Sequence, residues 1–145
     1  DLYGLLKELG IKTEYTGVDI LEKMIERAKK CFPDADFHSA DIFQENFQAF
    51  GEFGQNSFDV TFTSGIFNLN AGNNEVFLKN AVPMLAQLAE KAFVFNLLDP
   101  ASPDRDDNYF YYDPEQAIRL AEPFSKDIQK VKGYLDNDYT LICIK

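Results

Sequence analysis

The sequence predicts an α/β domain with a mostly parallel β-sheet, helices on both of its faces and a closing antiparallel β-hairpin. Two observations support this prediction. Strand-like and helix-like apolar patterns alternate along most of the chain, and such alternation favours parallel strands joined by helical crossovers. The chain then ends on two strand-like segments, residues 127–135 and 139–145, which are separated only by the turn at residues 136–138.

The first forty residues predict a helix, a strand, a second helix and a second strand. Leu2, Leu5, Leu6 and Leu9 recur at helical spacing, and Gly10 is a suitable helix stop. A β-branched segment follows, and then a second apolar helical pattern that ends before Pro33. The expected elements are a helix over residues 2–9, a strand over 13–18, a helix over 21–31 and a strand over 35–40.

The remaining residues continue the alternation. Pro83 lies inside the strongest helical pattern and predicts a kink or a later start of that helix. Asp113 precedes a proline and is the expected N-cap of the last helix. The expected elements are a short helix over residues 45–50, a strand over 58–64, a loop over 65–72, a helix over 74–91, a strand over 92–98, a loop over 99–113 and a helix over 114–121.

Composition and charge limit the functions that the chain can have. A length of 145 residues with 46% hydrophobic residues predicts one globular domain over residues 1–145. A formal charge of −10 argues against nucleic acid or an anionic membrane as a partner. His38 is the only histidine, so we expect no metal site. Cys31 and Cys143 have the character of reduced packing residues, which favours a cytoplasmic location.

Two carboxylates occupy positions that matter in such a sheet. Asp19 follows the first predicted strand, and Asp41 follows the second. If the two strands are parallel, both side chains lie at the carboxyl edge, where open α/β sheets bind their ligands. Simpler roles remain open, since Asp19 can cap the helix that follows it and Asp41 can be an exposed turn residue.

Several short motifs in order carry a resemblance to a known family. They are GVDI at residues 17–20, ADIF at 40–43 and FDVTFTSGIFN at 58–68, followed by the terminal hairpin. With these motifs the chain resembles the class I S-adenosylmethionine-dependent methyltransferases, which have a Rossmann-like fold. The resemblance implies S-adenosylmethionine as cofactor.

The resemblance also assigns roles to individual positions. Asp19 corresponds to the acidic residue that binds both ribose hydroxyls, and Ile20 and Leu21 would pack near the adenine. Asp41 corresponds to the residue that faces the exocyclic amine of adenine, and Ile42 to its neighbour against the ring.

The segment at residues 64–68 corresponds to the loop beside the transferred methyl group, and this implies that Ser64 and Gly65 contribute to the cofactor site. The Asn/Asp-Pro-Pro-Tyr form of this loop is not present in the chain. The resemblance therefore leaves a small molecule as the expected methyl acceptor.

The family has a first strand and a glycine-rich turn ahead of the first helix, and these 145 residues do not contain them. The resemblance therefore predicts an N-terminally truncated domain without its first central strand. We expect such a chain to bind S-adenosylmethionine weakly or not at all. Its exposed strand edges would permit a homodimer.

The acceptor would lie near the acidic and aromatic loop over residues 99–112, whose side chains suit a cationic or amine substrate. The candidate acceptor contacts are Asn68, Asp99, Tyr109 and Tyr111, and Asp99 is the only candidate general base. A solvated loop explains the run at residues 104–107 equally well.

Two other functions remain open: a non-catalytic binding or scaffold module with a methyltransferase-like fold, and a nucleotide-binding oxidoreductase. The terminal hairpin argues against the oxidoreductase.

Overall fold

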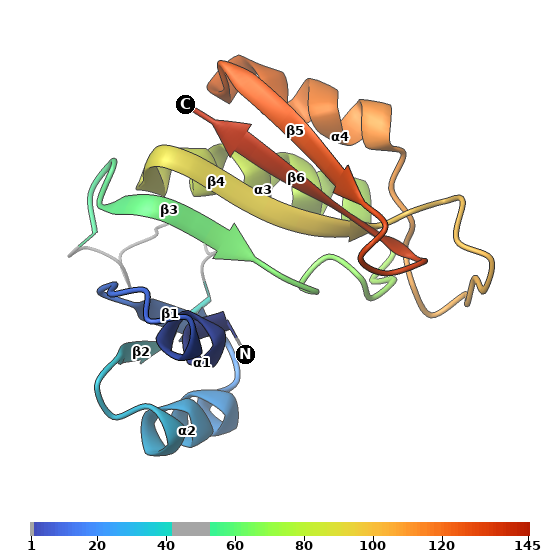
Figure 1. Cartoon of the computed structure of the whole chain (residues 1–145). Coiled ribbons are helices and arrows are strands. Elements are labelled where there is room, and N and C mark those ends of the chain that lie inside the picture. The colour runs from blue at the N-terminus through green and yellow to red at the C-terminus, as the bar shows by residue number, and fades with distance from the viewer. Residues whose placement is uncertain (1, 42–52) are drawn as a thin grey trace. The chain divides into compact units, whose positions relative to one another are not determined.

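The computed structural model describes residues 2–41 and 53–145 (Figure 1). The chain forms two compact units, Asp1–Glu52 and Phe53–Lys145, and each is described by itself. The helix expected over residues 45–50 and the candidate residue Ile42 lie outside the described residues. That residues 1–145 form a single domain stays a prediction.

The first unit contains the four elements that the sequence predicts. In chain order they are α1 (Leu2–Glu8), β1 (Thr16–Asp19), α2 (Glu22–Cys31) and β2 (Asp36–Ser39). The two strands are parallel, and their register runs from Thr16 opposite Asp36 to Asp19 opposite Ser39. Gly10 follows α1 with φ +69°, a left-handed conformation that suits glycine after a helix.

A small aromatic cluster holds the first unit together. The ring of Tyr3 lies 4.8 Å from that of Tyr15 and 5.3 Å from that of Phe32, between ring centroids. Gly17 lies under the ring of Phe37, where an added Cβ would stand 2.6 Å from the nearest ring carbon. A side chain at position 17 would therefore displace that ring.

The second unit contains a four-stranded sheet with two helices. In chain order its elements are β3 (Phe58–Thr63), α3 (Asn74–Leu88), β4 (Ala89–Leu98), α4 (Pro114–Ala121), a 3-10 helix (Glu122–Phe124), β5 (Asp127–Lys132) and β6 (Asp138–Ile144). The strand order is β3-β4-β6-β5. β3 and β4 are parallel, and both pairs made by β6 are antiparallel. The predicted α/β fold with parallel strands and a closing hairpin is confirmed.

The boundary between α3 and β4 differs from the prediction. The helix expected over residues 74–91 ends at Leu88, and the strand expected from residue 92 begins at Ala89. Residues 89–91 suit a helix by propensity, but Ala89 pairs with Phe58 of β3, and the carbonyl of Lys91 accepts from the N–H of Lys145. Tertiary pairing therefore overrides local preference. Pro83 lies inside a helix that begins at Asn74, so the later start was wrong.

The main core lies between the four-stranded sheet and its helices. α3 and α4 lie on the same face of the sheet (Figure 1). On that face β4 and β6 present buried side chains in register, namely Phe93 with Cys143, Phe95 with Leu141 and Leu97 with Tyr139. Burial raises the pKa of the Cys143 thiol to about 11, so this side chain packs as an unreactive apolar group.

Candidate functional site

Asp19 is the last residue of β1 and lies at the carboxyl edge of the two-stranded sheet. Its Oδ1 accepts a hydrogen bond from the backbone N–H of Leu21 at 2.8 Å. Leu21 is itself the N-cap of α2, so Asp19 holds the turn before the helix and does not occupy the cap position. Within the described residues its Oδ2 accepts no hydrogen bond, and this leaves one carboxylate oxygen available to a ligand.

Two apolar side chains flank this carboxylate in solvent. Ile20 is 64% exposed and Leu21 is 60% exposed. Exposed apolar surface beside a carboxylate suits a ligand that has both a flat apolar ring and hydroxyl groups. This arrangement is compatible with the ribose and adenine contacts that the sequence predicts for residues 19–21.

Asp41 follows β2 by two residues and is partly buried. The backbone N–H of Ala40 donates to the carbonyl of Asp19 at 3.1 Å, which joins the ends of the two strands. The first unit thus brings Asp19 and Asp41 to one edge, as the parallel register predicts.

Ser64 and Gly65 follow the carboxyl end of β3 in the second unit. Gly65 has φ +77°, and its N–H donates to Asn96 Oδ1 at 2.8 Å. Asn96 Nδ2 in turn donates to Asp138 Oδ2 at 2.6 Å. Asn96 is 9% exposed and Asp138 is 8% exposed. A buried polar chain from β6 through β4 therefore positions the turn after β3.

Three buried polar atoms without a partner lie at or shortly after the carboxyl ends of β3 and β4 in the chain. In the described residues, the buried side-chain oxygen and nitrogen atoms without a hydrogen-bond partner are Thr63 Oγ1, Asn68 Oδ1 and Ser102 Oγ. Nearly all buried polar groups in folded proteins are paired, so these atoms fit a site that receives a polar ligand or water. They mark the edge where open α/β sheets bind ligands.

Asp99 lies at the end of β4 and is 8% exposed. It forms an ion pair with Lys132 through Oδ2, and its Oδ1 accepts from the backbone N–H of Ala101 at 2.9 Å. The hydrogen bond from Lys132 holds the pKa of Asp99 below its usual value. A carboxylate engaged in this way is a weaker base, so the geometry gives no support to Asp99 as a general base.

The Asp99–Lys132 pair leads to a prediction on stability. We expect Lys132→Met to lower the free energy of unfolding by about 1–3 kcal/mol at pH 7, because it leaves a buried carboxylate without its cation. The folded-state pKa of Asp99 is depressed, so the pair stabilises the fold fully above the unfolded pKa of about 3.9 and loses this effect as pH falls through the folded pKa. Urea denaturation at several pH values measures the difference.

Lys130→Met is the matched control, since Lys130 lies on the same strand, approaches the exposed Glu115 at 3.9 Å and is the smallest of the causes that lower the pKa of Asp99. We expect the control to change stability by no more than about 0.5 kcal/mol. Equal losses in the two variants would contradict the role given to Lys132.

The loops after β3 and β4 are joined and form an open pocket of about 620 Å³. The N–H of Asn70 donates to the carbonyl of Asn108 at 2.8 Å, and that of Phe110 donates to the carbonyl of Asn68 at 2.9 Å. We call this cavity the loop pocket. Its lining residues are Asn70, Arg105, Asp106, Asp107, Tyr109, Phe110 and Tyr111.

Arg105 and Asn70 are pocket residues that sequence reasoning missed. The guanidinium of Arg105 lies 4.5 Å from the ring centroid of Tyr111, whose hydroxyl accepts from the N–H of Asp106 at 2.9 Å. A lone cation in an acidic loop was the available signal for Arg105. The predicted contacts Tyr109 and Tyr111 lie together in this pocket.

Two further structural findings concern metal binding and membrane spanning. In residues 2–41 and 53–145, no group of three or more His, Cys, Asp or Glu side chains could hold a metal ion. None of the described helices is long and apolar enough to cross a membrane.

Comparison with known proteins gives one family match. A family model described as a methyltransferase domain matches residues 2–87. No curated protein sequence matches the chain.

Similar solved structures include three methyltransferases. Magnesium protoporphyrin IX methyltransferase from Synechocystis PCC 6803 with bound SAH has a TM-score of 0.66 at 12% identity, over 94% of this chain and 65% of that chain. N-methyltransferase NodS from Bradyrhizobium japonicum WM9, in complex with S-adenosyl-L-homocysteine, has a TM-score of 0.60 at 13% identity. The match covers 91% of this chain and 66% of that chain. A TehB-like SAM-dependent methyltransferase from Corynebacterium glutamicum has a TM-score of 0.62 at 15% identity. The match covers 98% of this chain and 72% of that chain.

These identities show a shared fold. The chain spans 65%, 61% and 53% of the first three solved chains that it matches, so it corresponds to part of their length.

Proposed function

The chain belongs to the methyltransferase domain family, and from this premise we propose that it serves methyl transfer from S-adenosylmethionine to a small-molecule acceptor. The observation that carries the proposal is the Asp19 carboxylate at the carboxyl end of β1, with one oxygen anchored by Leu21 and the other available. A carboxylate in this place suits two neighbouring hydroxyl donors, as a ribose presents.

The described residues of the first unit fit part of a bound S-adenosyl cofactor. Asp19 would accept from the ribose hydroxyls, Ile20 and Leu21 would cover the adenine, and Asp41 would meet its amine. Ser64 and Gly65 lie in the second unit, in the loop that Asn96 positions, and their contribution to the cofactor site stays a prediction from the resemblance. When bound, the cofactor supplies a methyl group on a sulfonium, which is a good leaving group. The protein then contributes mainly alignment and desolvation.

The proposed acceptor is a small polar molecule with an amine or a cationic group. The loop pocket of about 620 Å³ is within the size range of small-molecule sites. Asp106, Asp107 and Tyr109 line it, while the charge of Arg105 is stacked on Tyr111. The net charge of −10 supports an acceptor other than nucleic acid and a site away from anionic membranes.

Calorimetric titration with S-adenosylhomocysteine tests the proposed cofactor. We expect weak or no binding by the chain of 145 residues, because it contains no Gly-x-Gly turn ahead of α1. A form extended ahead of Asp1 by a strand and a glycine-rich turn should bind it at micromolar concentration. Micromolar binding by the unextended chain would contradict the expectation of weak binding, and no binding by either form would contradict the proposed function.

A binding or scaffold module without catalysis, present as a homodimer, is the second candidate. β3 lies at the edge of its sheet and pairs on one side only within the described residues. Val60 is 53% exposed and Phe62 is 44% exposed on the same strand. An open edge with exposed apolar side chains favours pairing with a second copy. A monomeric mass by light scattering across a wide concentration range would exclude this candidate.

A reducing compartment such as the cytoplasm suits the two cysteines. Both Cys31 and Cys143 are free thiols, the first exposed and the second buried.

A further inference from the structure

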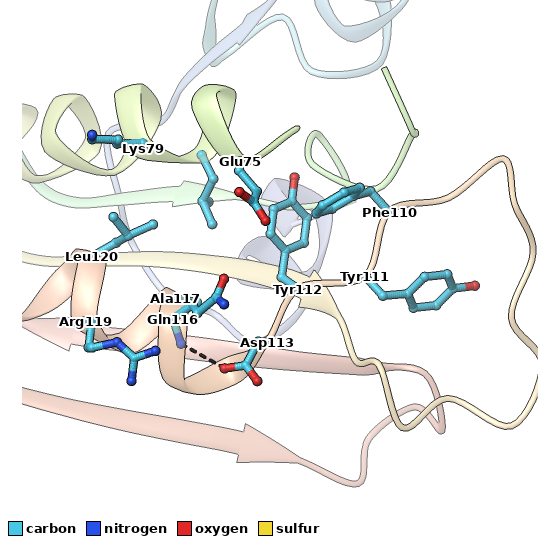
Figure 2. A pocket seen from close by; sticks show the side chains of 11 residues that line it. Glu75, Lys79, Phe110, Tyr111, Tyr112, Asp113, Gln116, Ala117, Arg119 and Leu120 are labelled. Atoms are coloured by element: carbon cyan, nitrogen blue, oxygen red, sulfur yellow. Dashed lines mark hydrogen bonds between the residues drawn. The ribbon is translucent and has the colours of Figure 1, made fainter. Parts of the chain in front are cut away.

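A second cavity lies between α3 and α4 and has a volume of about 320 Å³ (Figure 2). We call it the helix groove. It opens on the helix-covered side of the four-stranded sheet, and none of the proposed cofactor residues lines it. Its volume falls at the lower end of the range for small-molecule sites.

The floor of the helix groove is held in place before any ligand arrives. Tyr112 is 4% exposed, and its hydroxyl donates to the carbonyl of Phe67 at 3.2 Å. Its backbone N–H donates to the carbonyl of Leu98 at 2.9 Å, and its carbonyl accepts from the hydroxyl of Tyr139 at 3.0 Å. Anchors to three different segments make this floor rigid, so a ligand would lose little affinity to ordering it.

Charges of opposite sign lie at different positions along the groove. α3 and α4 each follow one of the parallel strands β3 and β4, so their N-termini lie at the same end. Glu75 and Asp113 belong to that end, whereas Lys79 and Arg119 lie further along their helices (Figure 2). Glu75 and Lys79 are one helical turn apart, a rise of about 6 Å.

Three of the four charges that line the groove are available to a ligand, while the fourth, Asp113, caps α4 through its Oδ1. In the part of the chain that the structure describes, none of Glu75, Lys79 and Arg119 forms an ion pair. Apolar floor residues lie between the two ends, with Leu78 at 2% and Ala117 at 1% exposure. An acidic end, an apolar middle and a basic end together match a molecule with an amine, an aliphatic chain and a carboxylate.

We propose that the helix groove binds a small zwitterion, with its amine at Glu75 and its carboxylate at Arg119. Phe110 and Tyr111 line both the helix groove and the loop pocket. The two cavities therefore share two lining residues. Binding to the groove does not depend on the proposed methyl transfer.

The same charges also have a purely structural explanation. Acidic residues near a helix N-terminus and basic residues further along complement the helix dipole without any ligand. A binding experiment separates the two explanations, because a dipole role affects stability and gives no saturable binding.

The test is an NMR titration of the 145-residue chain with 6-aminohexanoate, with hexylamine and hexanoate as probes that each lack one charge. We expect saturable shifts at the amides of Leu78, Ala117 and Phe110, and weaker binding of both single-charge probes. Glu75→Gln and Arg119→Gln should each weaken 6-aminohexanoate binding by about two- to five-fold, the range for exposed ion pairs.

Glu115→Gln is the matched control. Glu115 is a carboxylate in the first turn of α4 but does not line the groove. It should leave the affinity unchanged. The proposal is overturned if millimolar 6-aminohexanoate gives no saturable shift, if the control weakens binding as much as Glu75→Gln, or if hexanoate binds as well as the zwitterion.

Discussion

We expect Asn96→Asp to lower the free energy of unfolding by about 2–4 kcal/mol at pH 7. The amide of Asn96 links two buried groups: it accepts from the N–H of Gly65 at 2.8 Å and donates to Asp138 Oδ2 at 2.6 Å. A carboxylate at position 96 keeps the acceptor but replaces the donor by a second negative charge. Two carboxylates at this distance, in a site that excludes water, repel each other strongly.

The loss should shrink as pH falls. Two adjacent carboxylates share one proton, which raises the folded-state pKa of the pair above its unfolded value. A raised folded-state pKa contributes stability below that pKa, and this contribution is lost as pH rises through it. A protonated carboxyl at position 96 can also donate to Asp138 as the amide does. Urea denaturation between pH 7 and pH 5 measures the trend.

Exchange of the two side chains is the control. In the double variant Asn96→Asp with Asp138→Asn, the new carboxylate accepts both from the N–H of Gly65 and from the new amide at position 138. We expect this variant to recover most of the stability lost at pH 7. If Asn96→Asp has the stability of the wild type, or if the exchange gives no recovery, the polar chain does not position the turn after β3.

The second large effect is expected at Asp19. In the form extended ahead of Asp1, Asp19→Asn should weaken S-adenosylhomocysteine binding by about 100-fold. A carboxylate that accepts from two ribose hydroxyls makes two hydrogen bonds to a charged group, and each contributes about 1.5–3 kcal/mol. Asparagine keeps one oxygen for the N–H of Leu21, so the turn into α2 should be preserved. Calorimetric titration measures the change in affinity.

Asp59→Asn is the control for the lost charge. Asp59 is an exposed carboxylate near the amino end of β3 and pairs with Lys91 at 2.5 Å. This variant should bind S-adenosylhomocysteine as the wild type does. An affinity within threefold of wild type for Asp19→Asn would argue that the residue only shapes the turn.

Features that depend on neighbouring residues were predictable from the sequence. The apolar spacing around Leu2–Glu8 and Glu22–Cys31 predicted both helices of the first unit. Asp113 caps α4, as expected, since its Oδ1 accepts from the N–H of Gln116 at 3.0 Å. Asp19 was predicted at the strand end because a β-branched segment stops there. These features follow from backbone geometry within a few residues.

The boundary at Leu88 and Ala89 depended on tertiary structure. Local propensity continues the helix through residue 91, but pairing of Ala89 with Phe58, 31 positions away, begins the strand. Periodicity reports which face of an element is apolar, and it does not report which distant strand competes for the same backbone groups.

The polar partners of the site were also set only by the tertiary structure. Asn96 meets Gly65 across 31 positions and Asp138 across 42 positions of the chain. Lys132 pairs with Asp99, which changes a candidate base into an engaged carboxylate. The sequence by itself determined the order of the elements and the carboxylates at their ends, because those depend on short-range patterns. Folding decided which side chains meet, because strands distant in sequence become neighbours only in the sheet.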